Sequence, residues 1–321
     1  MTAAAAVAVA SVVVGAPAAW ACGGLVAPNG TVRLLRTSTL AAYADGIEHY
    51  ITSFQFAGGG AEVGSIVPLP AKPSKVERGG DWTLQRLQRE TQPVRARAGA
   101  LEAAAAPLAD AKVILEVRID ALDITVLEGG GRAVGDWARK NGFALTPDAP
   151  AVLDFYASRS PYFMAARFDA AAARDRGQEV GDGTPVHLTI PTPDPWVPLR
   201  ILALGRGELE PIDADVYLLT PRRPSLLPAP AAGLSLQYDR QASSRLLDDL
   251  RSDKGMEWVP EDMWLSHLRV ATRAGNLTYD LAISADGRGA PSARAAGLDL
   301  ATVASSTVTS PRVTAPPATT P

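Results

Sequence analysis

The stretch VILEVRIDALDITVL, residues 113–127, decides the fold class of this 321-residue chain. Apolar side chains recur at every second position over 113–120 and again over 122–127, and a period of two is typical of strands rather than helices. Three consecutive glycines, residues 129–131, close the second run with a turn signal. The stretch therefore predicts β-structure with one side of each strand buried.

The rest of the chain extends this pattern in both directions. We predict strands at 32–37, 47–56 and 63–69 that form an antiparallel meander, and further strands at 162–168, 186–190, 196–204 and 214–220. A last hairpin is expected from 265–273 and 277–284 across Ala274-Gly275-Asn276. Short apolar runs edged by Gly and Pro are typical of strands joined by turns.

Helical spacing is confined to short segments. A helix capped by Asp81 and ended by Pro93 presents Trp82, Leu84 and Leu87 on one side. Further short helices are expected at 134–141, 148–158, 241–251 and 258–264. The predicted fold class is α+β, with a predominantly antiparallel sheet and short helices packed on it.

Composition and charge exclude several classes of protein. Hydrophobic residues make up 47% of the chain and charged residues 20%, which is typical of a globular protein with a core. The 31 Lys and Arg are balanced by 34 Asp and Glu, so the chain lacks the basic excess that binds a phosphate backbone. We expect no nucleic-acid partner.

The first 21 residues have the features of a secretory signal. They carry no charged side chain, include an Ala/Val-rich run, and end in Ala19-Trp20-Ala21 before Cys22. We expect cleavage at this point and an extracytoplasmic protein; the alternative is a buried N-terminal helix. Cys22 would then be the first residue, either lipidated and tethered to the outer face of the membrane or left unmodified in a secreted protein. Trp20 fits a lipidation motif poorly.

The predicted domain organisation follows from the two ends. Residues 1–21 are the signal peptide, 22–284 the α+β globular region, and 285–321 an Ala/Ser/Thr/Pro-rich disordered tail. From Ser305 onward the Ser/Thr/Pro composition lacks the apolar area that would compensate for ordering the chain. We see no hydrophobic segment there of the length that spans a bilayer.

Three segments together resemble a known family. They are CGGLVAPNG at 22–30, IVPLP at 66–70, and 124–168 with its Asp136-Trp137-Ala138 and Asn141-Gly142-Phe143 core. They resemble the bacterial exported family known only as domain of unknown function 2330, over about residues 22–223. The resemblance implies an extracytoplasmic, often envelope-tethered protein and brings no activity, cofactor or catalytic residue. Some relatives have a second nearby Cys or a C-terminal membrane helix, and this chain has neither.

Sites that carry chemistry are sparse. Cys22 is the only cysteine, which excludes an intramolecular disulfide and every multi-cysteine metal site. The three histidines, His49, His187 and His267, fall in separate strand-like segments without metal-binding spacing. We assign no metal ligand, cofactor or catalytic residue, although a composite metal site assembled by folding stays open. The adjacent acidic pairs, Asp248-Asp249 and Glu261-Asp262, are interpreted as solvated positions.

Two functions of different classes remain. The first is a non-catalytic binding or structural module of the cell envelope whose partner is an unidentified envelope component. The second is an N-terminal-nucleophile amide hydrolase, in which the thiol of a mature Cys22 lies beside its own free amine. The flexible Gly23-Gly24 that follows argues against a preorganised nucleophile, so the binding module is preferred.

Overall fold

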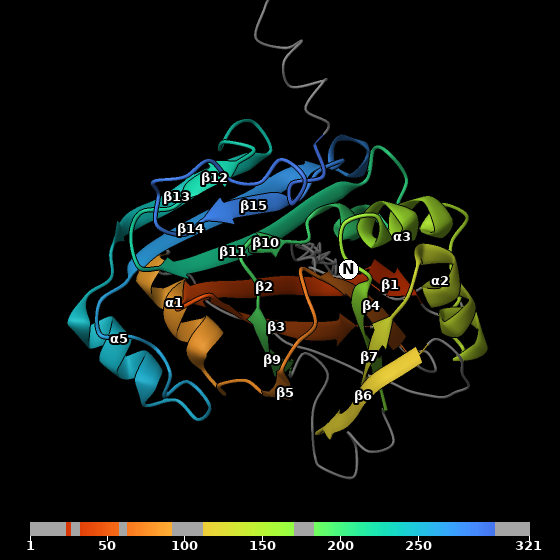
Figure 1. The fold of residues 1–321 in the computed structure, drawn as a ribbon, viewed down its shortest axis with the longest axis horizontal. Helices are drawn as coiled ribbons and strands as arrows, with labels where there is room; N and C mark the ends of the chain where they lie inside the picture. The colour runs from red at the N-terminus through yellow and green to blue at the C-terminus, as the bar shows by residue number, and fades with distance from the viewer. Residues whose placement is uncertain (1–23, 27–32, 58–62, 92–111, 170–182, 299–321) are drawn as a thin grey trace, which may run out of the picture.

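The computed structural model describes residues 24–26, 33–57, 63–91, 112–169 and 183–298. These residues form three β-sheets with short helices packed on two of them (Figure 1). Every strand pair but one is antiparallel, the exception being β11 with β2. The predicted α+β class with a dominant antiparallel sheet is therefore confirmed.

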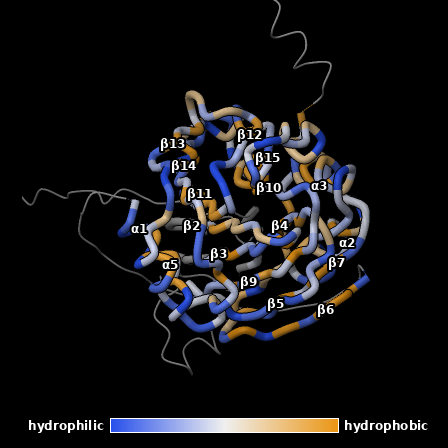
Figure 2. The backbone as a smooth tube through the Cα atoms, turned by 60° about the vertical axis from the view of Figure 1, so that its left-hand side comes forward, coloured by the Kyte–Doolittle hydropathy of each residue, from blue (hydrophilic) through white to orange (hydrophobic). Residues whose placement is uncertain are grey.

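A five-stranded sheet contains most of the stretch 113–127. Its order is β1 (Gly24–Val26), β4 (Val63–Leu69), β8 (Tyr162–Phe168), β7 (Leu122–Glu128) and β6 (Lys112–Ile119). β6 and β7 are the two predicted strands, joined at Asp120, whose φ of 54° makes the tight turn. β6 forms the outer edge of this sheet (Figure 2).

A seven-stranded sheet forms the second layer. Its order is β13 (Leu234–Gln241), β14 (Trp264–Arg273), β11 (Pro211–Thr220), β2 (Arg33–Ala44), β3 (Ile47–Ala57), β9 (Thr184–Pro191) and β5 (Lys75–Arg78). A small third sheet joins β10 (Trp196–Val197), β15 (Leu281–Ser284) and β12 (Ser225–Leu227).

The helices cover the outward faces of the two large sheets. α1 (Thr83–Thr91) and α5 (Ser244–Arg251) pack on the seven-stranded sheet through Leu84, Leu87 and three leucines of α5, whereas α2 (Gly131–Lys140) and α3 (Ala149–Ala157) pack on the five-stranded sheet (Figure 1). Two 3₁₀ turns lie at Arg200–Ala203 and Ala274–Asn276. None of the helices in the described ranges is long and apolar enough to cross a bilayer.

The main core lies between the two large sheets. Alternation directs Tyr50 and Leu188 of the seven-stranded sheet and Ile124, Val126 and Met164 of the five-stranded sheet into it, and all five are almost fully buried. The opposite face of each strand carries a different set of side chains. This alternation places all functional candidates described below on outward faces.

Several predicted pairings are wrong although the strands themselves exist. β4 does not continue a meander with β2 and β3, because it pairs with β1 and β8 while β3 pairs with β9. β14 and β15 are likewise not a hairpin: β14 pairs with β11 and β13, and β15 with β10 and β12. Partner choice depends on contacts between segments far apart in sequence, which local periodicity does not contain.

Four local predictions also need correction. The strand expected at 196–204 ends at Val197, because Pro198 donates no ladder hydrogen bond, and a 3₁₀ turn follows. The helix expected at 241–251 begins at Ser244, and Gln241 ends strand β13, which the sequence analysis missed. No helix forms at 258–264, where β14 begins at Trp264. The α1 terminus is held by Asp253, which accepts hydrogen bonds from the Asp81 and Trp82 amides, rather than by Asp81.

The packed region extends beyond the predicted boundary at residue 284. Ala295 and Ala296 are buried against the α2–α3 layer, and the Asp280 amide donates to the Ala296 carbonyl. Residues 285–298 therefore belong to the folded part, and Gly297 lies so close to the Phe155 ring that a Cβ atom there would come within 2.2 Å of it. The Ala-rich segment around 101–111 and the predicted tail beyond 298 lie outside the described residues.

Candidate ligand-binding cleft

A cleft of about 450 Å³ lies on the outer face of the five-stranded sheet. Its floor comes from β6, β7 and β8 and includes Glu116, Arg118, Asp123, Thr125 and Arg167. Its wall comes from the end of α2 and the residues after it, namely Trp137, Asn141 and Phe143. The size falls within the ~300–1,000 Å³ that small-ligand sites occupy.

Strand register brings the floor residues together. Asp123 of β7 is directly opposite Arg118 of β6 on one side and Arg167 of β8 on the other. Thr125 lies two residues further along the same face, opposite Glu116. Because α2 and α3 cover only the part of this face around Leu127 and Phe163, the charged end of the sheet is left as the cleft floor.

Two glycines shape the wall. Gly142, with φ of 80°, ends α2 in a conformation that other residues rarely adopt. The chain then turns back, and the Phe143 amide donates to the Ala138 carbonyl at 2.9 Å. The Phe143 ring lies against Gly64 of β4, where a Cβ atom would come within 2.0 Å of the ring. The ring can occupy this place only because residue 64 has no side chain.

The charges on the floor compensate one another. Asp123 contacts Arg118 at 3.2 Å and Arg167 at 3.0 Å, and Arg118 also binds Asp169 at 2.5 Å. The hydrogen bond to Asp169 raises the pKa of Arg118, with the nearby carboxylates adding to the shift. The two cations Arg118 and Arg167 thus face three anions, namely Asp123, Asp169 and Glu116. Such a surface offers many hydrogen-bonding groups and no large excess of either sign.

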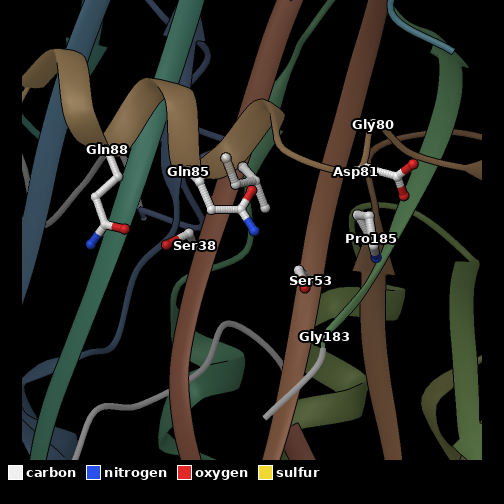
Figure 3. A pocket seen from close by; sticks show the side chains of 9 residues that line it. Ser38, Ser53, Gly80, Asp81, Gln85, Gln88, Gly183 and Pro185 are labelled. Carbon is white, nitrogen blue, oxygen red and sulfur yellow. The ribbon is translucent and has the colours of Figure 1, made fainter. Parts of the chain in front are cut away.

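A second, smaller hollow of about 80 Å³ lies beneath α1 (Figure 3). Ser38 and Ser53, which are opposite each other on β2 and β3, lie on one side of it, and Gln85 and Gln88 approach from the helix. A polar space of this size suits a few water molecules. It is too small for most metabolites.

Serine, aspartate and histidine occur near this small hollow but not in the order that a hydrolase needs. Asp215 of β11 lies next to Ser38 in the register, and its Oδ1 is 2.7 Å from His267 Nε2 of β14. Strand β11, which carries Asp215, therefore lies between β2 with Ser38 and β14 with His267. In a catalytic triad the imidazole stands between the other two groups, so this arrangement is not a triad.

The structure brings two of the three histidines together. His49 Nδ1 is 3.0 Å from His187 Nε2, whereas His267 pairs with Asp215 on another part of the sheet. Sequence spacing could not reveal the pair, because 138 residues separate its members. Cys22 lies outside the described residues.

The carboxylates of Asp248 and Asp249, interpreted from the sequence as solvated, bind different partners. Asp248 contacts Arg251 and Asp249 contacts Arg86, on different sides of α5. Asp262 accepts a hydrogen bond from Gln241. The side chains of Asp248 and Asp249 thus serve separate surface contacts.

One buried polar cluster was missed by the sequence analysis. Asp280 is fully buried and accepts hydrogen bonds from the Tyr156 hydroxyl at 2.8 Å, from the Leu199 and Arg200 amides, and from Arg159. Burial raises the pKa of Asp280, although Arg159 opposes that shift. Because its oxygens hold together three separate segments, we interpret Asp280 as a structural anchor rather than a reactive group.

A bacterial family described as an uncharacterised conserved protein, domain of unknown function 2330, matches residues 16–232. The chain belongs to this family. The resemblance carried by residues 22–30, 66–70 and 124–168 is thereby confirmed, and the cleft lies wholly within the matched range. No curated protein matches the chain.

Solved structures of baculovirus P35 overlap loosely with this member of the family. P35 itself has a TM-score of 0.44 at 10% identity, covering 80% of this chain and 98% of P35. A mutated P35 after caspase cleavage has a TM-score of 0.42 at 9% identity, covering 78% and 99%. P35 in its caspase-8 complex has a TM-score of 0.40 at 10% identity, covering 78% and 95%. A likeness at this level does not extend to function.

Proposed function

We propose that this protein is a non-catalytic binding module of the cell envelope and that its ligand occupies the cleft beside α2. The observation that carries the proposal is the cleft itself, a hollow of about 450 Å³ with a hydrogen-bonding floor. Ligand sites of this size typically combine an apolar lining with a few fixed polar groups. Here Trp137 and Phe143 supply the apolar part and Arg118, Asp123 and Arg167 the polar part.

The charge balance of the floor favours a neutral ligand. Arg118 and Arg167 are already paired with carboxylates, so an anionic ligand would have to compete with Asp123 and Asp169. A cation would meet the two guanidinium groups. A neutral chain rich in hydroxyl and amide groups can bond to both signs of charge without displacing either, and we propose a glycan of the envelope as the ligand class.

A co-sedimentation assay with purified peptidoglycan sacculi tests the cleft. Thr125→Trp fills the cleft floor, and Arg118→Ala removes one of its donors; both should weaken binding at least tenfold. The matched control is Arg269→Ala, since Arg269 is an equally exposed strand arginine paired with Asp213 in the other large sheet. The proposal would be refuted if the Thr125→Trp variant bound sacculi as tightly as the wild-type protein does, or if the wild-type protein did not bind them.

The envelope location is a separate part of the proposal and rests on residues 1–22. The intact mass of the protein purified from its host tests it. A diacylglyceryl group on Cys22 would support a membrane tether, and a soluble form beginning at an unmodified Cys22 would support secretion. Recovery of the full chain from the cytoplasm would refute both. If Cys22 proves free, hydrolysis of amide substrates that a Cys22→Ser change abolishes would favour the N-terminal nucleophile instead.

A further inference from the structure

The pair of histidines on the helix-covered face of the seven-stranded sheet has an unusual geometry. His49 on β3 and His187 on β9 are diagonal neighbours on antiparallel strands. Their facing nitrogens, Nδ1 of His49 and Nε2 of His187, are 3.0 Å apart. Only one of these nitrogens can carry a proton in that gap, so at least one lone pair points at the space between the rings.

Both rings favour the uncharged form. Burial lowers the pKa of His49 and of His187 to about 4 in each case. His187 is 1% exposed, whereas His49 is partly open to solvent.

The neighbours hold the two rings in place. The Trp258 ring stacks on His49 with centroids 3.6 Å apart and planes within 5° of parallel. On the far side of His187, Glu77 Oε1 is 3.7 Å from Nδ1. Glu77 also contacts the exposed Lys75 at 2.7 Å, which compensates the charge of that lysine. At 3.7 Å the carboxylate is beyond hydrogen-bond distance, and the buried Nδ1 has no hydrogen-bond partner among the described residues. A small movement of the Glu77 side chain would let a protonated Nδ1 donate to it, which would leave Nε2 free to act as a ligand.

A transition-metal ion fits this arrangement with little movement. Two imidazole nitrogens at ~2.0–2.1 Å from a tetrahedral ion lie about 3.3 Å apart. The observed 3.0 Å therefore needs an opening of only a few tenths of an ångström. Among the described residues no group of three or more His, Cys, Asp or Glu is arranged to hold an ion, so the proposed site has two protein ligands.

We propose that His49 and His187 bind a divalent late transition-metal ion, Zn²⁺ or Cu²⁺, with Glu77 as a positioning residue for His187. Imidazole pairs favour these ions over Mg²⁺ and Ca²⁺, which prefer oxygen ligands. The site lies on a different sheet from the cleft beside α2 and does not depend on the function proposed for it.

Isothermal titration of the untagged full chain with Zn²⁺ tests the proposal, with the Cys22→Ser variant used throughout to remove the thiol. We expect one ion per chain, loss of binding in His49→Gln and in His187→Gln, and about tenfold weaker binding in Glu77→Gln. His267→Gln is the matched control, because His267 is also a buried histidine on the same sheet face, and it should bind as before.

An NMR titration keeps the test independent of how well the variants fold. The chain has three histidines, so their imidazole resonances can be assigned individually. Zn²⁺ should shift those of His49 and His187 and leave those of His267 in place, while Mg²⁺ should shift none. Absence of a shift at His49 and His187, or binding that survives both glutamine changes, would overturn the proposal.

Discussion

The carboxyl group of Glu48 gives the sharpest test of the packing between the two large sheets. Glu48 lies on the core-facing side of β3, fully buried between the sheets. Burial raises its pKa from 4.5 to about 8, while the Trp196 backbone amide offsets part of the shift. The carboxyl is therefore protonated in the folded state at neutral pH and ionised in the unfolded chain.

The sign and size of the effect on stability follow from proton linkage. Between pH 4.5 and 8 the folded state holds one proton more than the unfolded state at this site, so the free energy of unfolding falls as the pH rises. The slope is about 1.4 kcal/mol per pH unit. At pH 7, some 2.5 units above the unfolded pKa, Glu48 should cost about 3 kcal/mol relative to a neutral residue of the same shape.

Glu48→Gln supplies that neutral residue. Urea unfolding of the wild type and the variant at pH 5, 6, 7 and 7.5 should give a stability difference that grows in favour of glutamine by about 1.4 kcal/mol per pH unit. Glu116→Gln, an exposed glutamate on β6, is the control and should show no such trend. A Glu48→Gln difference that stays constant from pH 5 to 7.5 would refute the reasoning.

Three further predictions concern other parts of the fold. Asp280→Ala leaves the guanidinium of Arg159 buried without its carboxylate and should destabilise the protein by about 3–5 kcal/mol, measured by urea unfolding; a loss below 1 kcal/mol would contradict the anchor role. Gly64→Ala places a Cβ atom against the Phe143 ring and should lower the free energy of unfolding by about 1–3 kcal/mol, measured as a lower melting temperature. An unchanged melting temperature would show that Phe143 can move aside without loss of stability. Because His49 and His187 have lowered pKa values, their contribution to stability is present above pH 6.5 and lost as the pH falls towards 4. Replacing both with glutamine should therefore reduce the pH dependence of the free energy of unfolding over that range, measured by urea unfolding. An unchanged pH dependence would count against neutral rings.

The sequence predicted strands better than it predicted their partners. β4 and β8 have the bounds expected from the pattern, 63–69 and 162–168, because alternation and flanking prolines act over a few residues. Their pairing with each other joins segments about 100 residues apart. Sequential strands often pair, so the meander was a reasonable prediction, but the core between the sheets is completed only when β4 and β3 belong to different layers.

The cleft shows the same division between local and distant information. The contact of Arg118 with Asp123 lies within one hairpin and follows from the two-residue period of residues 113–127. Arg167 joins them only through β8. The sequence gives no sign that α2 stops short of these three residues and leaves them uncovered, because that depends on where Gly64 lets Phe143 pack.

Residues 48 and 49 show why neighbours in sequence are poor guides to a site in a sheet. A glutamate followed by a histidine suggests a carboxylate–imidazole pair, yet successive residues of a strand point to opposite faces. Glu48 enters the core between the sheets and His49 lies under Trp258 on the other side. The carboxylate that does approach the histidine pair is Glu77, directly opposite His187 in the register of β5 and β9. If the Glu48→Gln change alters the pH dependence of stability between pH 4.5 and 8 and the Glu77→Gln change alters Zn²⁺ affinity, then the alternation of β3, rather than distance along the chain, divides these roles.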